Sequence, residues 1–120
     1  MQVKNAEDER VQALLRALGF CAKARALVYG TPMVCEALKG NKKPHLVVSA
    51  LDNAPNTQKR IADRCAFYGV SLVSAHTTGA DLAHALGKEG HLAVVAITDE
   101  QLCRLVRSKL SALEKNETEQ

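Results

Sequence analysis

Apolar residues recur along this chain in two alternating patterns, and each pattern predicts a different kind of element. Steps of three or four residues, as at Val11, Leu14 and Leu18, are typical of the buried face of a helix. Short continuous apolar runs, such as residues 46–51, are typical of strands that are covered on both faces. The predicted helices cover residues 6–22, 32–39, 57–68, 80–86 and 99–110, and the predicted strands cover residues 26–29, 46–51, 70–73 and 92–97.

Short polar residues and glycines mark where these helices begin and end. The expected N-terminal caps are Asn5, Thr31 before Pro32, Thr78 with Asp81, and Thr98 with Gln101. Gly40 is expected to stop the second helix in a left-handed conformation, and Gly69 is expected to stop the third. Residues 114–120 are expected to fray beyond an ordered core of residues 6–113.

The alternation of helices and strands predicts an α/β fold. The economical arrangement is a three-layer α/β/α sandwich, in which a small mixed sheet of about four strands carries helices on both faces. The chain length suits a single domain, residues 1–120, and the sequence contains no internal repeat or linker. No apolar run approaches the roughly 20 residues of a membrane span. The polar start of the chain is unlike a signal peptide, so we expect a cytoplasmic protein with no membrane association.

Charge is distributed unevenly along the chain. The net charge is +3, but acidic residues gather at both ends, and residues 10–113 alone carry 14 Lys and Arg against 7 Asp and Glu, a net charge of +7. A basic body indicates a polyanionic partner such as nucleic acid, although a solvated basic surface with no partner would have the same composition. Aromatic residues make up 3% of the chain, which argues against a platform of rings that stacks single-stranded bases.

No residue pattern indicates catalysis or a resident metal. The cysteines at positions 21, 35, 65 and 103 are too far apart for a metal-ligating or redox pair, and their apolar neighbours predict buried, reduced thiols. The histidines are dispersed and lack the spacing of metal ligands. Asp52 follows a buried strand, where α/β enzymes often place an acid, but the Asn-Ala-Pro-Asn that comes next favours a helix cap or a turn. We therefore expect a protein that is not an enzyme and needs no cofactor.

The second predicted helix begins with a candidate anion site. Residues 30–33 open this helix, and the free N–H groups of a helix N-terminus attract phosphate oxygens. Lys23 and Arg25 precede the segment, and lysines at 39, 42 and 43 follow it. The arrangement favours RNA binding, and the structural alternative is a well-capped helix with solvated lysines.

Several segments, in order along the chain, resemble one family. They are residues 14–18, residues 22–30 ending in Ala26-Leu27-Val28-Tyr29-Gly30, residues 52–61 followed by Asp63-Arg64-Cys65 and Tyr68, residues 82–89 ending in Leu86-Gly87-Lys88-Glu89, and residues 94–99. They resemble the bacterial YlxQ-type proteins, of the superfamily of kink-turn RNA-binding ribosomal proteins typified by archaeal large-subunit proteins seven and thirty. The resemblance covers about residues 14–107 and implies a non-catalytic RNA-binding protein with an α/β/α sandwich fold.

The resemblance also implies a binding site with two regions. Members of the superfamily grip a sharply bent RNA helix with the helix start at the Gly-Thr position and with the loop before the last strand, which correspond here to residues 30–36 and 88–92. A kinked duplex concentrates phosphates and widens a groove around sheared G·A pairs, so its shape and exposed base edges are recognised. The implied RNA-binding residues are Lys23, Arg25, Gly30, Thr31, Pro32, Met33, Glu36, Lys88, His91 and Leu92.

This chain departs from the family in the first of these regions. RNA-binding relatives tend to carry Gly-Thr-Asn-Glu-x-x-Lys, whereas Pro32, Met33 and Glu36 stand here in place of Asn, Glu and Lys. Proline has no amide donor, methionine has no strong hydrogen-bonding atom, and a glutamate repels phosphate. Contacts that read bases are worth roughly 1–3 kcal/mol each, so these substitutions predict an altered or weakened site.

Two hypotheses describe the function. In the first, the chain is a ribosome-associated protein that binds structured RNA, either rRNA or another kinked RNA. In the second, it is a protein-interaction adaptor on the same scaffold, whose RNA face has degenerated and whose Met33 and Leu92 form an apolar docking patch. The two differ in salt dependence, because RNA binding weakens steeply as ionic strength rises.

Overall fold

The computed structural model describes residues 6–118 and confirms the alternation of helices and strands. The elements in chain order are α1 (Ala6–Lys23), β1 (Leu27–Tyr29), α2 (Thr31–Lys39), β2 (Leu46–Ser49), α3 (Pro55–Tyr68), β3 (Leu72–Ser74), α4 (Gly79–Ala85), β4 (Val94–Ile97) and α5 (Glu100–Thr118). The strands form a four-stranded sheet in the order β1-β4-β2-β3. Because β2 and β3 are parallel and the other neighbours are antiparallel, the predicted mixed sheet is confirmed.

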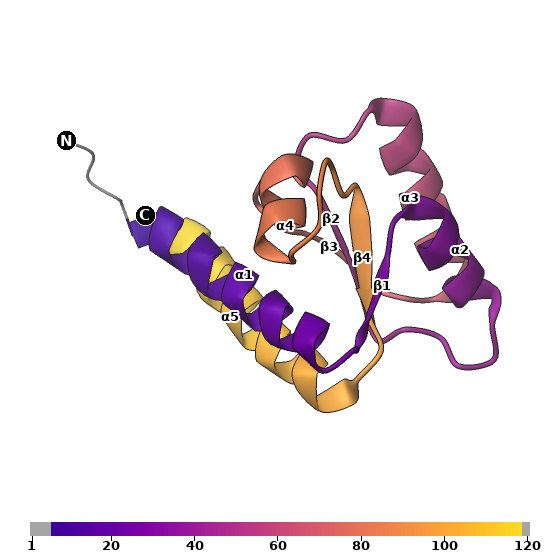
Figure 1. Ribbon diagram of the computed structural model, residues 1–120, viewed down its shortest axis with the longest axis horizontal. Helices are drawn as coiled ribbons and strands as arrows, with labels where there is room; N and C mark the ends of the chain where they lie inside the picture. The colour runs from indigo at the N-terminus through magenta and orange to yellow at the C-terminus, as the bar shows by residue number, and fades with distance from the viewer. Residues whose placement is uncertain (1–5, 119–120) are drawn as a thin grey trace.

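Helices cover both faces of the sheet, as the predicted sandwich requires (Figure 1). One hydrophobic core lies between the sheet and α1, α4 and α5, and a second lies between the sheet and α2 and α3. Side chains of β2 alternate between them, with Leu46 and Val48 in the first core and Val47 in the second. Every residue of β2 and of β4 is buried, so their continuous apolar runs do belong to strands covered on both faces.

The starts of α2 and α5 differ by one residue from the sequence prediction. Gly30, rather than Thr31, is the N-cap of α2, because a glycine can adopt the φ of 86° and ψ of 155° with which the chain leaves β1. At α5, the carboxylate of Asp99 accepts a hydrogen bond from the Leu102 N–H at 2.8 Å. Asp99 is therefore the cap rather than Thr98, whose N–H donates to the carbonyl of Ala26 at 2.9 Å.

Other predicted helix ends have mixed outcomes. Thr78 caps α4, since its hydroxyl accepts a hydrogen bond from the Asp81 N–H at 3.1 Å, and Gly69 ends α3, both as predicted. Gly40 is extended rather than left-handed, because its N–H closes the last turn of α2 on the carbonyl of Ala37 and the chain runs straight on. α3 begins at Pro55, before the predicted Thr57, and α5 continues to Thr118, past the position where fraying is expected. The predicted cap Asn5 lies outside the described residues.

The cysteines are all buried and free of disulfides, as the sequence predicts. Burial raises the pKa of the Cys21 thiol and of the Cys65 thiol to about 11. A thiol with so high a pKa stays protonated at neutral pH, and the protonated form is a poor nucleophile.

We therefore expect the folded chain to be inert towards Ellman's reagent at neutral pH, because all of its thiols are buried and because those of Cys21 and Cys65 are also protonated. All of them should react as soon as guanidinium chloride unfolds the chain. The measurement is the absorbance of the released thionitrobenzoate before and after unfolding. Rapid reaction of any thiol in the folded chain would contradict the burial described here.

Candidate nucleic-acid interface

The end of β1 and the start of β4 lie side by side because these strands pair antiparallel. Gly30 follows β1 directly, and its N–H donates to the carbonyl of Val94, the first residue of β4, at 2.9 Å. The backbone conformation of Gly30 is one that essentially only glycine adopts without strain. The first turn of α2 is thereby attached to the start of β4, as the course of the chain in Figure 1 shows.

The loop between α4 and β4 (residues 86–93) contacts the same end of β1. The ammonium of Lys88 lies 4.3 Å from the centroid of the Tyr29 ring, within the range of a cation–π contact. Tyr29 is the last residue of β1 and precedes Gly30. The structure therefore brings together the two predicted regions, residues 30–36 and 88–92, which we call the junction site.

The first turn of α2 offers backbone donors to the junction site. The Val34 N–H donates to the carbonyl of Gly30 at 2.9 Å, but no described residue accepts a hydrogen bond from the N–H of Thr31 or of Met33. This turn also contains no acidic side chain. Since a helix N-terminus carries partial positive charge, the turn can bind an anionic oxygen.

The substituted positions in α2 have distinct surroundings. Met33 is 60% exposed and presents a thioether where the resemblance to the family implies a carboxylate. Glu36 forms an exposed ion pair with Lys39 at 3.2 Å. Such a pair contributes little to stability, yet the lysine offsets the charge of Glu36, so repulsion of phosphate is weaker than the sequence alone indicates.

Lys23 and Arg25 lie at the opposite end of β1 from the junction site. Arg25 has a φ of 58°, and its N–H donates to the carbonyl of Ala22 at 3.0 Å, while the Ala26 N–H donates to the carbonyl of Cys21 at 2.8 Å. These bonds end α1 with a left-handed residue, where glycine is the usual choice. The left-handed backbone of Arg25 makes its side chain a candidate functional group.

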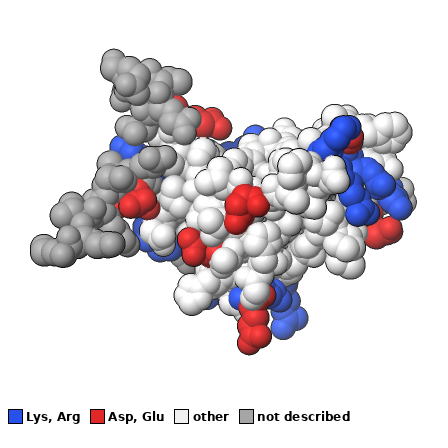
Figure 2. Space-filling model, turned by 90° about the horizontal axis from the view of Figure 1, so that it is seen from above, with Lys and Arg blue, Asp and Glu red and all other residues white. Residues whose placement is uncertain are grey.

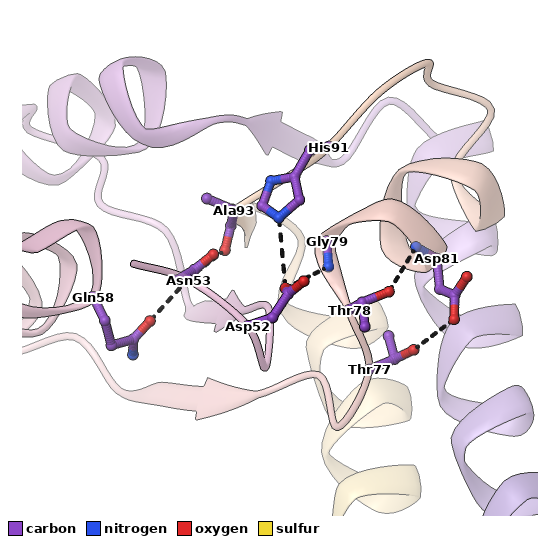
Figure 3. A network of polar contacts seen from close by, with 9 residues as sticks. All are labelled: Asp52, Asn53, Gln58, Thr77, Thr78, Gly79, Asp81, His91 and Ala93. Atoms are coloured by element: carbon purple, nitrogen blue, oxygen red, sulfur yellow. Dashed lines mark hydrogen bonds and ion pairs between the residues drawn. The ribbon is translucent and has the colours of Figure 1, made fainter. Parts of the chain in front are cut away.

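A polar network fixes the loop before β4 to the start of α4 (Figure 3). The carboxylate of Asp52 accepts a hydrogen bond from the Gly79 N–H at 2.9 Å and lies 3.5 Å from Nε2 of His91. The Leu92 N–H donates to the carbonyl of Gly79 at 3.0 Å. Of the two roles predicted for Asp52, the turn is confirmed, whereas the N-cap of the helix that follows is Ala54. The carboxylate of Asp52 instead binds the first N–H of α4, the helix whose N-cap is Thr78.

The hydrogen bond from Gly79 lowers the pKa of the Asp52 carboxyl below its usual 3.8, and the neighbouring His91 lowers it further. Asp52 is therefore ionised at neutral pH, and it forms an ion pair whenever the His91 imidazole is protonated. Gly79 is required here for space, because a Cβ at this position would collide with the imidazole of His91. We call Asp52, Gly79 and His91 the loop clamp.

A second contact supports the loop clamp from β2. The side-chain amide of Asn53 donates to the carbonyl of Ala93 at 3.0 Å and to Oε1 of Gln58 at 2.9 Å. Gln58 in turn donates to the hydroxyl of Ser49 at 3.3 Å. Sequence reasoning missed Asn53, Gln58 and Gly79 because their contacts form only in the folded chain. For Asn53 and Gln58, the available signal was the resemblance of residues 52–61 to a family segment.

The predicted apolar patch is smaller than the sequence indicates, and the basic side chains lie in more than one region. Leu92 packs partly against the first core, so Met33 is the exposed member of the predicted apolar patch. In Figure 2, Lys and Arg side chains gather over the end of the molecule formed by α2 and α3. The basic residues of α2, of α3 and of the loop after α2 are Lys39, Lys42, Lys43, Lys59, Arg60 and Arg64. Basic side chains therefore also gather in a region away from the junction site. The distribution of charge alone does not show which of these two regions binds a polyanion.

The described residues contain no cluster of three or more His, Cys, Asp or Glu side chains placed to bind a metal ion. Within the same residues, no helix combines the length and apolar character that crossing a membrane requires.

Sequence comparison relates the chain to proteins of one family. A family model described as the ribosomal protein L7Ae/L30e/S12e/Gadd45 family matches residues 12–106. The chain is also similar to the RNA-binding protein YlxQ of Bacillus subtilis (strain 168). The identity is 34% over 83 residues, which cover 69% of this chain and 80% of that protein.

Structural comparison gives a consistent result for the fold. A protein of unknown function from Bacillus halodurans superposes with a TM-score of 0.73 at 26% identity, covering 82% of this chain and 96% of that one. The 15.5 kD RNA-binding protein of Giardia lamblia superposes with a TM-score of 0.72 at 20% identity, covering 96% of this chain and 94% of that one.

We expect Gly79→Ala to loosen the loop before β4 without unfolding the chain. The added Cβ displaces the His91 imidazole, which is the end of a movable side chain. Alanine suits a helix better than glycine by up to about 1 kcal/mol, so the free energy of unfolding should change by less than about 1 kcal/mol. Hydrogen exchange at the Leu92 amide, which bonds to Gly79, should become roughly tenfold faster or more. Gly19→Ala is the matched control, because a Cβ there meets nothing within 4 Å. Equal Leu92 exchange rates in the two variants would show that no clamp acts at Gly79.

We expect the stability contributed by the Asp52 carboxylate to depend on pH. Its folded pKa lies below its unfolded value, so this contribution is fully present above the unfolded pKa and is lost as pH falls through the folded pKa. Asp52→Asn removes the charge, so the wild-type chain should be more stable than the variant at neutral pH. Chemical denaturation across the acid range should show that difference shrinking below about pH 4. A difference that stays constant to about pH 2 would mean that the Asp52 charge does not stabilise the fold.

Proposed function

The chain belongs to the ribosomal protein L7Ae/L30e/S12e/Gadd45 family, and on this basis we propose that it is a non-catalytic protein that binds structured RNA at the junction site. Its target is rRNA or another RNA with a kink-turn-like bend, and its place of action is the cytoplasm, in association with the ribosome. The name of the Bacillus subtilis relative, an RNA-binding protein, supports this proposal.

The observation that carries the proposal is the juxtaposition of residues 30–36 with residues 88–92. Gly30 lets the backbone approach closely, and the N–H groups of Thr31 and Met33 donate to no described residue. Lys88 lies against the ring of Tyr29, the residue before Gly30, and supplies a cation for a phosphate. A sharply bent RNA presents phosphates on both sides of its bend, so it can meet the helix start and the loop together.

Recognition at this site is weakened relative to RNA-binding family members. Pro32 and Met33 supply no side-chain hydrogen bonds to base edges, and Glu36 adds a negative charge that Lys39 only partly offsets. His91 and Leu92 then contribute by shape, and phosphate contacts carry a larger share of the binding. Two further cations, Lys23 and Arg25, lie at the other end of β1, where they can bind RNA phosphates beyond the bend.

A protein-interaction adaptor is the second candidate function. The exposure of Met33, with Pro32 beside it at the head of α2, favours this alternative, because an apolar side chain there can contact another protein. In that case the affinity for the partner would change little with ionic strength.

The direct test is a titration of the purified chain into a labelled kink-turn RNA and into the same RNA with its G·A pairs replaced by Watson–Crick pairs, at two salt concentrations. We expect the kinked RNA to bind more tightly, with an affinity that falls steeply as salt is raised. Equal binding of both RNAs would refute recognition of the bend, and absence of binding to either would favour the adaptor.

The same titration assigns the binding face. Arg25→Glu combined with Lys88→Glu should weaken binding at least tenfold, because two phosphate contacts become repulsive, roughly one unit of salt slope for each. Arg60→Glu on α3 is the matched control, since it reverses a charge in the basic region away from the junction site. If the control weakens binding as much as the double variant, the assignment to the junction site is wrong. Circular dichroism checks that all variants are folded.

A further inference from the structure

A groove of about 410 Å³ lies along α1 beside α4. Its walls are formed by one face of α1 together with a single residue of α4. The lining residues are Gln12, Leu15, Arg16, Gly19, Phe20, Lys23 and Ala85. This volume falls within the range of roughly 300–1,000 Å³ that is usual for sites of small ligands.

The lining combines an aromatic ring with two cations. Phe20 is 56% exposed, so its ring is open to contact by a ligand. Arg16 and Lys23 lie four residues before it and three residues after it, so all three share one face of the helix. Neither cation forms an ion pair with any described residue, and no acidic residue lines the groove.

Gly19 provides an independent indication that the groove is kept open. Glycine within a helix costs about 1 kcal/mol relative to alanine. The packing of this protein does not demand it, because a Cβ added at Gly19 would meet nothing within 4 Å. The absence of a side chain therefore leaves a flat surface beside the Phe20 ring, open to a ligand rather than to the protein itself.

The groove adjoins the junction site through the end of α4. Ala85 is the last residue of α4, and three residues later the Lys88 N–H donates to the carbonyl of Ala83 at 2.8 Å. The side chain of Lys88 then extends to Tyr29. Figure 1 shows α4 lying against α1, with the loop that leads to β4 beside α4.

We propose that this groove binds an unpaired nucleotide that flanks the RNA held at the junction site. The base stacks on Phe20 over the surface at Gly19, and Arg16 and Lys23 bind the adjoining phosphates. A single ring accommodates one base and not a long strand, in agreement with the scarcity of aromatic residues. An anionic, planar ligand fits these walls better than an apolar protein helix does, because the two cations need a counter-charge. This inference rests on the proposed function only for the position of the bent RNA helix at the junction site.

The test compares a kink-turn stem with blunt ends and the same stem with a four-nucleotide single-stranded extension at either end. Wild-type protein should bind one of the extended RNAs about tenfold more tightly, the usual value of stacking one base on an aromatic side chain. Phe20→Ala should abolish this gain and leave the affinity for the blunt stem unchanged. The matched control is Phe67→Ala, which removes an exposed ring (79%) on α3 and should retain the gain. An equal loss in both variants would overturn the proposal.

Gly19→Ala separates binding from stability. Because alanine favours the helix, this variant should unfold at a higher temperature than wild type, yet it should lose roughly threefold or more of the gain from the extension. A variant that is more stable and binds the extended RNA as wild type does would overturn the proposal.

A second measurement makes the groove testable without the kinked stem. Tetraadenylate added to the ¹⁵N-labelled chain should shift the Gly19 amide resonance in a saturable way. That shift together with equal binding of bent and unbent stems would refute the proposed function and support the groove. No shift, combined with no gain from either extension, would refute the groove while leaving recognition of the bend intact. A stronger shift with an acidic helical peptide than with tetraadenylate would assign the groove to a protein partner and overturn the proposal.

Discussion

The antiparallel pairing of β1 with β4 determines where the candidate RNA contacts lie. Because the two strands run in opposite directions, the end of the first meets the start of the last, and the hydrogen bond from Gly30 to Val94 attaches α2 at that point. In a parallel pairing, the end of β1 would lie a full strand length away, roughly 10 Å for a strand this short. The junction site therefore exists because β1 and β4 pair in opposite directions, and its side chains are supplied by segments that are distant in the sequence.

The loop clamp performs the same task for the loop before β4. The position of residues 88–92 depends on groups outside that loop, chiefly Asp52 after β2 and Gly79 at the start of α4. A site that recognises a bent RNA by shape needs its two halves held at a fixed separation. Substitutions in α2 have removed side chains that could contact bases, but the backbone geometry and the clamp remain. The proposed binding of RNA for this reason rests on the recognition of shape more than on the recognition of base identity.

Much of the fold could be predicted because its signals are local. Apolar periodicity identified the helices and strands, and the continuous burial of residues 46–49 followed from their uninterrupted apolar character. Errors arose where tertiary contacts set the end of an element: Thr98 still pairs through its N–H with the carbonyl of Ala26, so α5 begins one residue later than predicted and Asp99 caps it. The two regions of the junction site could be predicted only from the resemblance to a family. Asn53, Gln58 and Gly79 were not identified, because their roles depend on partners that only the folded chain brings near.

Amide hydrogen exchange of the full chain, with and without a kink-turn RNA, tests the central claim most directly, because it reports which backbone groups the RNA covers. The account predicts that slowing is concentrated at the amides of Thr31 and Met33 and at residues 88–92, with little change in α3. Protection concentrated on the basic residues of α3 and the loop after α2, with the amides of the junction site unaffected, would contradict it.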